Sequence, residues 1–140
     1  MSNNLPTKEL IIAVVEKDDT LLMRKKPAGS LPYKETWYSF GCERIPIQDD
    51  QTTLKNYLKT EVGINVKVDN ELIPFDTEIK QDHDGVEKNF IYINLRCKYL
   101  NGDLKNPKGI ERVDWIPTNK LSEYDIVPPS VRLFKKLGYL

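Results

Sequence analysis

The segment WYSFGCERIPIQDDQTTLKNYLKTEVGINV, residues 37–66, decides which fold the chain can adopt. It starts with an apolar turn at Trp37–Gly41, continues through a polar loop and ends in a predicted helix. Asp49 or Asp50 can cap this helix, because an aspartate side chain accepts hydrogen bonds from the free amides of the first turn. Gly63 is expected to end it, since glycine enters the left-handed conformation without steric cost.

The predicted helix has one apolar face. Its apolar residues recur at helical spacing: Leu54, Tyr57, Leu58 and Val62. Lys55, Asn56 and Lys59 fall away from this face. The spacing therefore predicts a helix that packs on the rest of the fold through one side.

The flanking sequence predicts strands. The runs ELIIAVVE and TLLMRKK, on either side of Lys17–Asp19, predict an antiparallel hairpin. Further strands are predicted over Asn65–Val68, Leu72–Lys80, Asn89–Leu100 and Glu111–Ile116. A short helical turn at Asn119–Glu123 and a helix at Pro129–Leu137 complete the pattern.

The strand predicted over Asn89–Leu100 carries the strongest signal. Five residues would share one of its faces: Ile91, Ile93, Leu95, Cys97 and Tyr99. Asn94, Arg96 and Lys98 would lie on the other. The Asp82–Gly85 turn before it predicts a hairpin with His83 at its tip, in water. Together these elements predict an α+β fold with a mixed sheet, in a single domain spanning residues 1–140.

Composition limits the partners. The chain has 21 basic and 21 acidic residues, so no overall field would attract nucleic acid or an anionic membrane. Its longest apolar run, Leu10–Val15, is too short to span a bilayer, and the first residues lack the regions of a signal peptide. We expect a soluble, cytoplasmic protein in which Cys42 and Cys97 are reduced thiols. A metal site or catalytic triad built around the single histidine, His83, is disfavoured.

The order of these elements resembles the Nudix superfamily, which includes MutT-like hydrolases, over nearly the whole chain. The segments that carry the resemblance are the hairpin ending in LLMRKK, Trp37–Gly41, Glu61–Ile64, Glu111–Ile116 and Pro128–Ser130. The resemblance implies an α/β/α sandwich with a central box helix and a C-terminal helix. It also implies Mg²⁺- or Mn²⁺-dependent hydrolysis of a nucleoside diphosphate linked to another group. A homodimer is one arrangement that it leaves open.

The family's signature box is degenerate in this chain. The box consists of glycine, five residues, glutamate, seven residues, and then Arg-Glu-apolar-x-Glu-Glu-x-Gly-apolar. Aligned on Gly63 and Ile64, the chain carries Cys42 for the opening glycine, Gln48 for the isolated glutamate, Asn56 for the arginine, and Tyr57 and Thr60 for two of the clustered glutamates. Only Glu61 keeps its carboxylate. The scaffold positions match the family, and most of the reactive ones do not.

This departure bears directly on the chemistry. Three carboxylates at i, i+3 and i+4 share one helix face, where Mg²⁺ can bridge them to phosphates. A face of Tyr57, Thr60 and Glu61 offers one carboxylate, which is a poor site for a cation that sheds water reluctantly. A loss of roughly 4 to 6 kcal/mol of charge stabilisation slows a reaction about a thousandfold or more.

Four residues are candidates for a functional site. Glu61 is the candidate catalytic and metal-binding residue, while Glu43 and Arg44, after the glycine turn, are candidates to meet a substrate phosphate. Arg24, on the second strand, is a candidate ligand contact, with a solvent-facing charge as its alternative.

Three functions remain open. The first is a weak or inactive hydrolase that keeps a cleft for a phosphorylated ligand, such as a nucleoside diphosphate derivative, and needs no metal. The second is an active metal-dependent pyrophosphohydrolase that supplements Glu61 with Glu43, Glu87 or Glu111. The third is a protein-interaction module without catalysis. Missing ligands favour the first, but fold alone does not choose among them.

Overall fold

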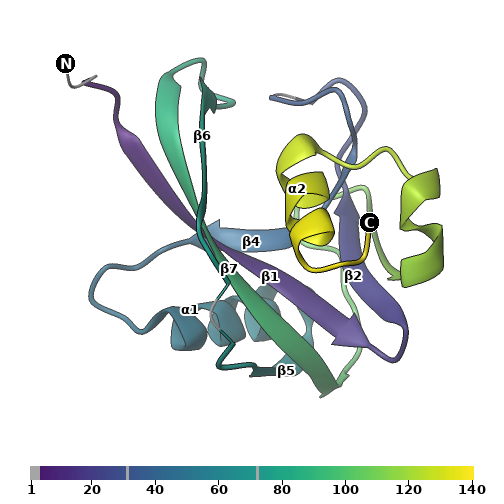
Figure 1. Ribbon diagram of the computed structural model, residues 1–140. Coiled ribbons are helices and arrows are strands. Elements are labelled where there is room, and N and C mark those ends of the chain that lie inside the picture. Colours follow the sequence, from purple (N-terminus) through teal and green to yellow (C-terminus); the bar gives the residue numbers. More distant parts are fainter. Residues whose placement is uncertain (1–3, 31, 72) are drawn as a thin grey trace.

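The computed structural model describes residues 4–30, 32–71 and 73–140 (Figure 1). The strands in these ranges are β1 (Thr7–Lys17), β2 (Thr20–Lys25), β3 (Trp37–Tyr38), β4 (Phe40–Glu43), β5 (Ile64–Val68), β6 (Asp76–Gln81), β7 (Glu87–Gly102) and β8 (Arg112–Pro117). The helical segments are α1 (Asp50–Tyr57), η1 (Leu58–Val62), η2 (Thr118–Glu123) and α2 (Pro128–Lys136). None of these helices is long and apolar enough to span a membrane.

The centre of the sheet is a parallel pair. Strand β1 runs beside β7 in register from Thr7–Asn89 to Glu16–Lys98. The order of strands through the sheet is β3-β2-β1-β7-β5, and β4 pairs with β1, β6 with β7 and β8 with β2. Every pairing other than that of β1 with β7 is antiparallel. The sheet is therefore mixed, as the sequence predicts.

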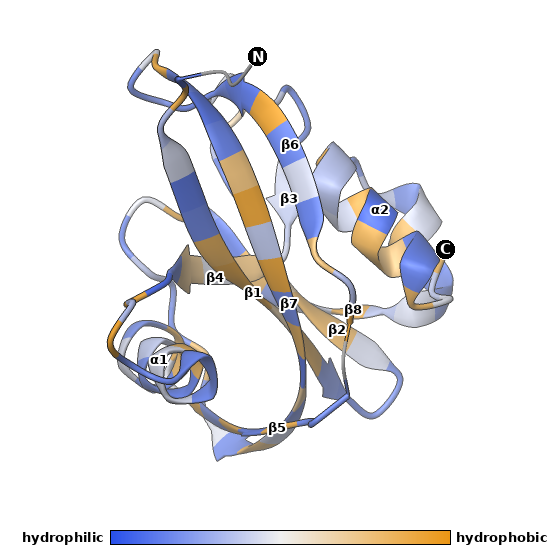
Figure 2. Cartoon of the chain, turned by 60° about the vertical axis from the view of Figure 1, so that its left-hand side comes forward, coloured by the Kyte–Doolittle hydropathy of each residue, from blue (hydrophilic) through white to orange (hydrophobic). Residues whose placement is uncertain are grey.

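The two long helices cover opposite faces of this sheet (Figures 1 and 2). Alternate residues of β1 point to opposite faces, and they belong to two different cores. Ile11 and Val15 pack in the core that includes Leu54, Leu58 and Val62 of the α1 side. Val14 packs in the core that includes Leu133 and Phe134 of α2. These layers confirm the predicted α+β class and the α/β/α sandwich.

Both predicted ends of the central helix are confirmed. The carboxylate of Asp49 accepts a hydrogen bond from the amide of Thr52 at 3.1 Å, so Asp49 is the N-cap. Gly63 ends the helix with a φ of 88°. Its last turn differs from the prediction, because Gly63 N–H donates to the carbonyl of Leu58 at 2.8 Å and Leu58–Val62 forms a π turn.

One strand prediction needs correction, and one face of β7 is more buried than its residue types suggest. Strand β6 begins at Asp76, whereas the predicted strand began at Leu72, which lies outside the described residues. The face of β7 that carries Asn94, Arg96 and Lys98 is buried at Phe90, Tyr92 and Asn94 and exposed at Lys98. Because both faces of the sheet are covered, the alternation of residue types did not reveal that this side is buried too.

The hairpin predictions are confirmed. Strands β1 and β2 are antiparallel around Asp18, which has a φ of 54°. Strands β6 and β7 pair from Asp76–Tyr92 to Gln81–Glu87 across the predicted turn. His83 lies in that turn with its side chain 72% exposed.

Gly63 offers a direct test of this packing. A Cβ there would lie 2.4 Å from the carbonyl oxygen of Asp103, and the backbone would remain in the left-handed region. We expect Gly63→Ala to lower the free energy of unfolding by about 3 kcal/mol, measured by urea titration. Gly109→Ala is the control, because its φ of 84° is similar but no atom lies within 4 Å. It should cost about 1 kcal/mol, and equal losses at both sites would contradict this reading.

Candidate functional site

The helix face aligned with the box carries a single carboxylate. Thr60 and Glu61 are exposed in η1, whereas Tyr57 is partly buried, with its ring centroid 6.5 Å from that of Phe40. Gln48, in the place of the isolated glutamate, accepts a hydrogen bond from the hydroxyl of Thr53 at 2.7 Å. The structure thus brings no second acid to Glu61 from these positions.

The positively charged side chain of Arg24, on β2, lies beside this face. Its Nη1 donates to the hydroxyl of Tyr57 at 3.4 Å, and its Nε donates to the carbonyl of Ser39 at 3.2 Å. The guanidinium carbon lies 4.1 Å from the ring centroid of Tyr38 and 5.0 Å from that of Phe40. These rings hold the charged group in place.

The charge of Arg24 acts on two of the box positions. Burial raises the pKa of the Tyr57 hydroxyl, and the positive charge of Arg24 opposes that rise. Burial also raises the pKa of the Cys42 thiol to about 11, again against the effect of Arg24. The charge of Arg24 therefore reaches both the residue at the opening of the box and a residue on its helix.

The residues present do not fit a divalent ion. Within the ranges that the structure describes, no three His, Cys, Asp or Glu side chains lie close enough together to hold a metal. One carboxylate, one phenol and one hydroxyl, with a guanidinium 3.4 Å from the phenol, form a donor set that Mg²⁺ does not favour.

The predicted loop candidates are engaged elsewhere. Arg44 forms ion pairs with Glu9 at 3.2 Å and Asp50 at 3.0 Å, and Glu43 lies 3.5 Å from Lys8. Neither Glu43 nor Arg44 lines the pocket described next. Of the four predicted site residues, only Arg24 lines it.

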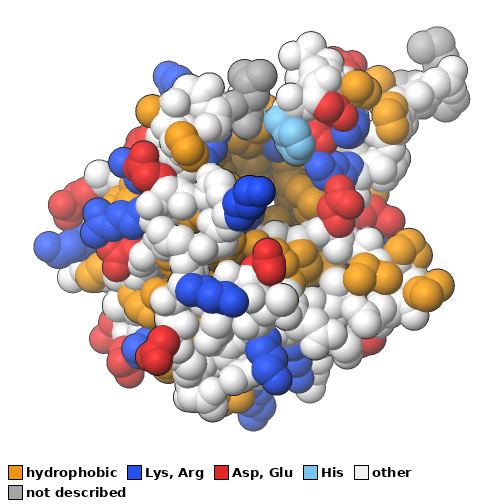
Figure 3. Space-filling view, turned by 180° about the vertical axis from the view of Figure 1, so that it is seen from behind, with side chains coloured by type: hydrophobic (Ala, Val, Ile, Leu, Met, Phe, Trp, Pro, Cys, Tyr) orange, Lys and Arg blue, Asp and Glu red, His pale blue; other side chains and the backbone are white. Residues whose placement is uncertain are grey.

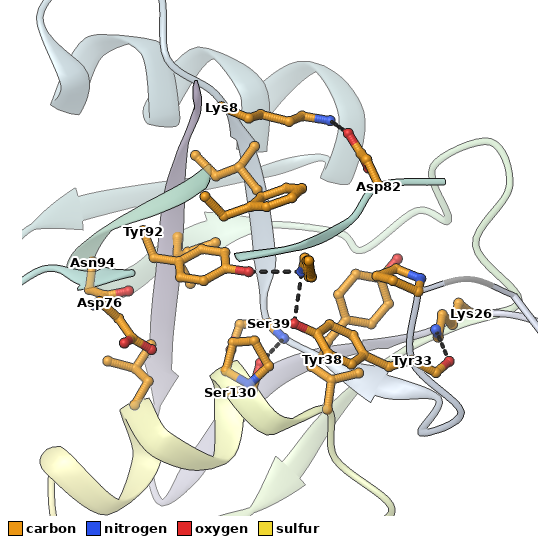
Figure 4. Close-up of a pocket in the computed structure, with 18 of the residues that line it drawn as sticks. Lys8, Lys26, Tyr33, Tyr38, Ser39, Asp76, Asp82, Tyr92, Asn94 and Ser130 are labelled. Carbon is orange, nitrogen blue, oxygen red and sulfur yellow. Dashed lines mark hydrogen bonds and ion pairs between the residues drawn. The ribbon is translucent and has the colours of Figure 1, made fainter. Parts of the chain in front are cut away.

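A pocket of about 300 Å³ lies between the sheet and α2 (Figures 3 and 4). Four aromatic side chains line it: Tyr33, Tyr38, Phe90 and Tyr92. In the space-filling view it is a hollow with an apolar interior and the histidine at its rim (Figure 3). This size is at the lower end of the range for small-molecule sites.

Three polar side chains are buried at the wall of the pocket. Ser39 is 3% exposed, and its Oγ has no hydrogen-bond partner among the described residues. Its own amide donates to Oγ of Ser130 at 3.3 Å. Asn94, on β7, donates to the carbonyl of Pro74 at 3.4 Å. An orphaned buried hydroxyl is costly, so Ser39 has capacity to bond a ligand.

A polar network joins the Tyr33 loop to the β6–β7 hairpin across the pocket (Figure 4). Lys80 Nζ donates to the hydroxyls of Tyr33 and Tyr92, each at 2.8 Å, and both hydroxyls donate to the Glu78 carboxylate. Burial raises the pKa of both phenols and lowers that of Lys80, against the effect of Glu78 on Lys80. Each phenol in this network accepts a hydrogen bond from Lys80 and donates one to Glu78, so both tyrosines are held in the protonated form.

A second cluster lies at the pocket rim, around Asp82. This side chain is 6% exposed and accepts hydrogen bonds from Lys8 and Lys88, each at 2.8 Å. Burial alone would raise its pKa, but the two ammonium groups outweigh burial and hold the pKa well below its usual range. The cluster ties β1 to the β6–β7 turn.

Sequence reasoning missed most of the pocket. Its lining comes from segments far apart in the chain, among them Tyr33, Asn94 and Ser130. The parallel pairing of β1 with β7 and the packing of α2 bring these segments together. The only available signal was a polar residue, Asn94, inside the strongest strand pattern.

Comparisons with solved structures identify the fold. A MutT protein from Methanosarcina mazei Go1 is 16% identical with a TM-score of 0.71, over 99% of this chain and 96% of that one. A MutT NUDIX hydrolase from Burkholderia pseudomallei is 12% identical with a TM-score of 0.73, over 94% and 98% of the two chains. A NUDIX hydrolase from Nitrosomonas europaea is 14% identical with a TM-score of 0.69, over 94% and 88%. No family model and no curated protein sequence matches the chain. The chain has the Nudix fold.

The Asp82 cluster gives a stability test. We expect Asp82→Asn to lower the free energy of unfolding at pH 7 by about 2 to 3 kcal/mol, because two partly buried ammonium groups lose their anion. The folded pKa of Asp82 is depressed, so its contribution is present above the unfolded pKa of about 4 and is lost as the pH falls below that value. The difference between wild type and variant should therefore shrink in acid.

Asp84→Asn is the matched control, measured by denaturant titration at several pH values. Asp84 is 48% exposed and lies 2.9 Å from the same Lys88. Its loss should have little effect at any pH. A difference between wild type and Asp82→Asn that does not change with pH would refute the assignment.

Proposed function

We propose that this protein binds a phosphorylated, nucleotide-like small molecule in the pocket between the sheet and α2, and that its hydrolase activity is weak or absent. The observation that carries the proposal is the pocket of about 300 Å³, which is lined by aromatic side chains and by Ser39, whose hydroxyl has no hydrogen-bond partner among the described residues. The Nudix fold of the chain makes a nucleoside diphosphate derivative the first class of ligand to test.

The lining of the pocket suits a planar polar ring. Aromatic side chains stack on such rings, and a few buried donors and acceptors set their orientation. Ser39, Ser130 and Asn94 supply those groups in the pocket lining. An apolar ligand without polar atoms would leave the hydroxyl of Ser39 unpaired and would be disfavoured.

The charges around the pocket favour an anion. Basic residues line it at five positions: Lys8, Arg24, Lys26, Lys80 and Lys136. The two acidic lining residues are already engaged, Asp76 by Arg132 at 2.9 Å and Asp82 by Lys8 and Lys88. Lys8 and Lys80 are likewise paired, with Asp82 and Glu78. Arg24, Lys26 and Lys136 have no ion pair among the described residues, so the balance left for a ligand is positive, which suits a phosphate.

The box helix supports weak or absent hydrolysis. Electrostatic stabilisation of the transferring phosphoryl group is the main source of catalysis in such reactions. Glu61 is the single box carboxylate. Of the acids proposed to join it, Glu43 is paired with Lys8 and Glu111 with Lys25 at 3.2 Å, while Glu87 lies at the start of β7, opposite Gln81 in the β6–β7 hairpin. Binding is therefore the function that these residues serve best. We also propose a cytoplasmic location, where the free thiols of Cys42 and Cys97 would stay reduced.

Ligand binding should depend on the unpaired hydroxyl. We expect nucleoside diphosphates in a thermal-shift and calorimetry panel to bind with EDTA present. Ser39→Ala should weaken that binding about fivefold to twentyfold, because it removes one buried hydrogen bond, without lowering the melting temperature of the free protein. Ser122→Ala, on the exposed side of η2, is the control. Absence of any ligand from a broad panel would instead favour the protein-interaction module.

The degenerate box predicts how turnover responds to mutation. Any background hydrolysis should be unchanged in Glu61→Gln, since this residue lacks partners for a metal site. A metal-dependent activity that disappears in Glu61→Gln would establish the active pyrophosphohydrolase instead.

Restoring the box should restore metal affinity. We expect the triple variant Gln48→Glu, Tyr57→Glu, Thr60→Glu to bind Mg²⁺ more tightly than the unmodified chain, measured by calorimetry, because it places clustered carboxylates on one helix face. A folded triple variant with no gain in Mg²⁺ affinity would show that the box alignment is wrong.

A further inference from the structure

Arg24 differs from every other arginine in the chain. The chain contains five arginines, and four of them have an acidic partner within 4.0 Å: Arg44, Arg96, Arg112 and Arg132. Arg24 forms no ion pair with any described residue, although it is partly buried. A partly buried charge without a counter-charge is costly, so its retention calls for an anionic partner from outside the chain.

The guanidinium has unused hydrogen-bonding capacity. Arginine carries five N–H donors, and only two of those of Arg24 meet protein acceptors, at 3.2 Å and 3.4 Å. Three N–H groups have no acceptor among the described residues. The rings of Tyr38 and Phe40 fix the orientation of the group, so little freedom would be lost on binding.

The position of Arg24 joins two parts of the site. It lines the pocket together with Tyr38 and Ser39 on one side. On the other side it contacts Tyr57, at a position where the box would carry a glutamate. A ligand whose ring occupies the pocket can therefore place its phosphates against this guanidinium.

We propose that Arg24 is the phosphate-binding residue of this protein, and that the chain binds the phosphates of its ligand through this guanidinium without a divalent metal. The inference deepens the proposed function, since it assumes a phosphorylated ligand. The planar fork of arginine matches two phosphate oxygens at once, which a single ammonium group does not. The loss of carboxylates at Tyr57 and Thr60 supports the same mode, because clustered acids beside Arg24 would neutralise it and repel phosphate.

Inorganic pyrophosphate, which has no ring to occupy the pocket, tests phosphate binding by Arg24 alone when EDTA is present. By isothermal titration calorimetry, the unmodified chain should bind it with no metal present. Arg24→Gln should weaken this binding at least tenfold, and Arg24→Lys should fall between the two. Arg112→Gln is the matched control, because that arginine is 64% exposed and pairs with Asp114 of its own strand, β8, which lies beside β2.

A second measurement does not depend on how the variants fold. In the unmodified protein, the Nε–H resonance of Arg24 should shift on titration with pyrophosphate while that of Arg112 stays in place. Pyrophosphate binding that requires Mg²⁺, or that is equal in wild type and a folded Arg24→Gln, would overturn the proposal. So would an unmoved Arg24 resonance.

Nucleosides separate this inference from the proposed function. Adenosine and guanosine carry the ring without phosphate, so their binding to the unmodified chain reports on the pocket and not on phosphate contacts. Arg24-dependent pyrophosphate binding without any nucleoside or nucleotide binding would support phosphate binding by Arg24 and reject the nucleotide-like ligand. Nucleotide binding that depends on Mg²⁺ and not on Arg24 would support ligand binding in the pocket and reject phosphate binding by Arg24.

Discussion

The parallel pairing of β1 with β7 is the constraint on which the rest of the structure depends. It joins Thr7–Glu16 to Asn89–Lys98 and pairs residues that are 82 positions apart in the sequence (89 − 7 = 82). This pair carries the sheet additions on both sides, with β2 and β4 on β1, and β5 and β6 on β7. Because its residues alternate between two faces, it also separates the α1 core from the α2 core. The box helix and the pocket wall are both supported by these two strands.

Charge balance around Arg24 links this scaffold to function. On the α1 side, Glu61 is the one acid left at the box positions, and Arg24 bonds the phenol that replaces another. On the pocket side, acids are neutralised within the protein while Arg24 has no acidic partner in the described ranges. The same substitutions that make the helix a poor place for a dication make its surroundings a better place for an anion. The proposed weakness of metal chemistry and the proposed direct binding of phosphate would thus both follow from one difference in charge.

Much of the fold could be predicted from local chemistry. Asp49 caps the helix and Gly63 ends it, because capping and left-handed turns depend on one or two residues. The hairpin around Asp18 follows for the same reason. The π turn at Leu58–Val62 was not predictable, because a single register change in the helix leaves no mark on apolar spacing.

The site was harder to predict than the fold. Arg24 was identified as a candidate, but its value depends on what it lacks, and an absent ion pair is visible only in three dimensions. Tyr33, Ser39 and Asn94 meet at one pocket only because distant segments pack together, so no spacing along the chain connects them. Glu43 and Arg44 follow the glycine turn as expected, yet they lie in surface ion pairs away from the pocket.

The most direct measurement is the binding of Mn²⁺ to the ligand-free protein, followed by the electron paramagnetic resonance signal of the free ion. With clustered carboxylates absent from the box helix, the unmodified chain should bind no more Mn²⁺ than its Glu61→Gln variant. Stoichiometric binding that is lost in Glu61→Gln would contradict the electrostatic deficit, and with it the reading of this protein as a metal-independent binder.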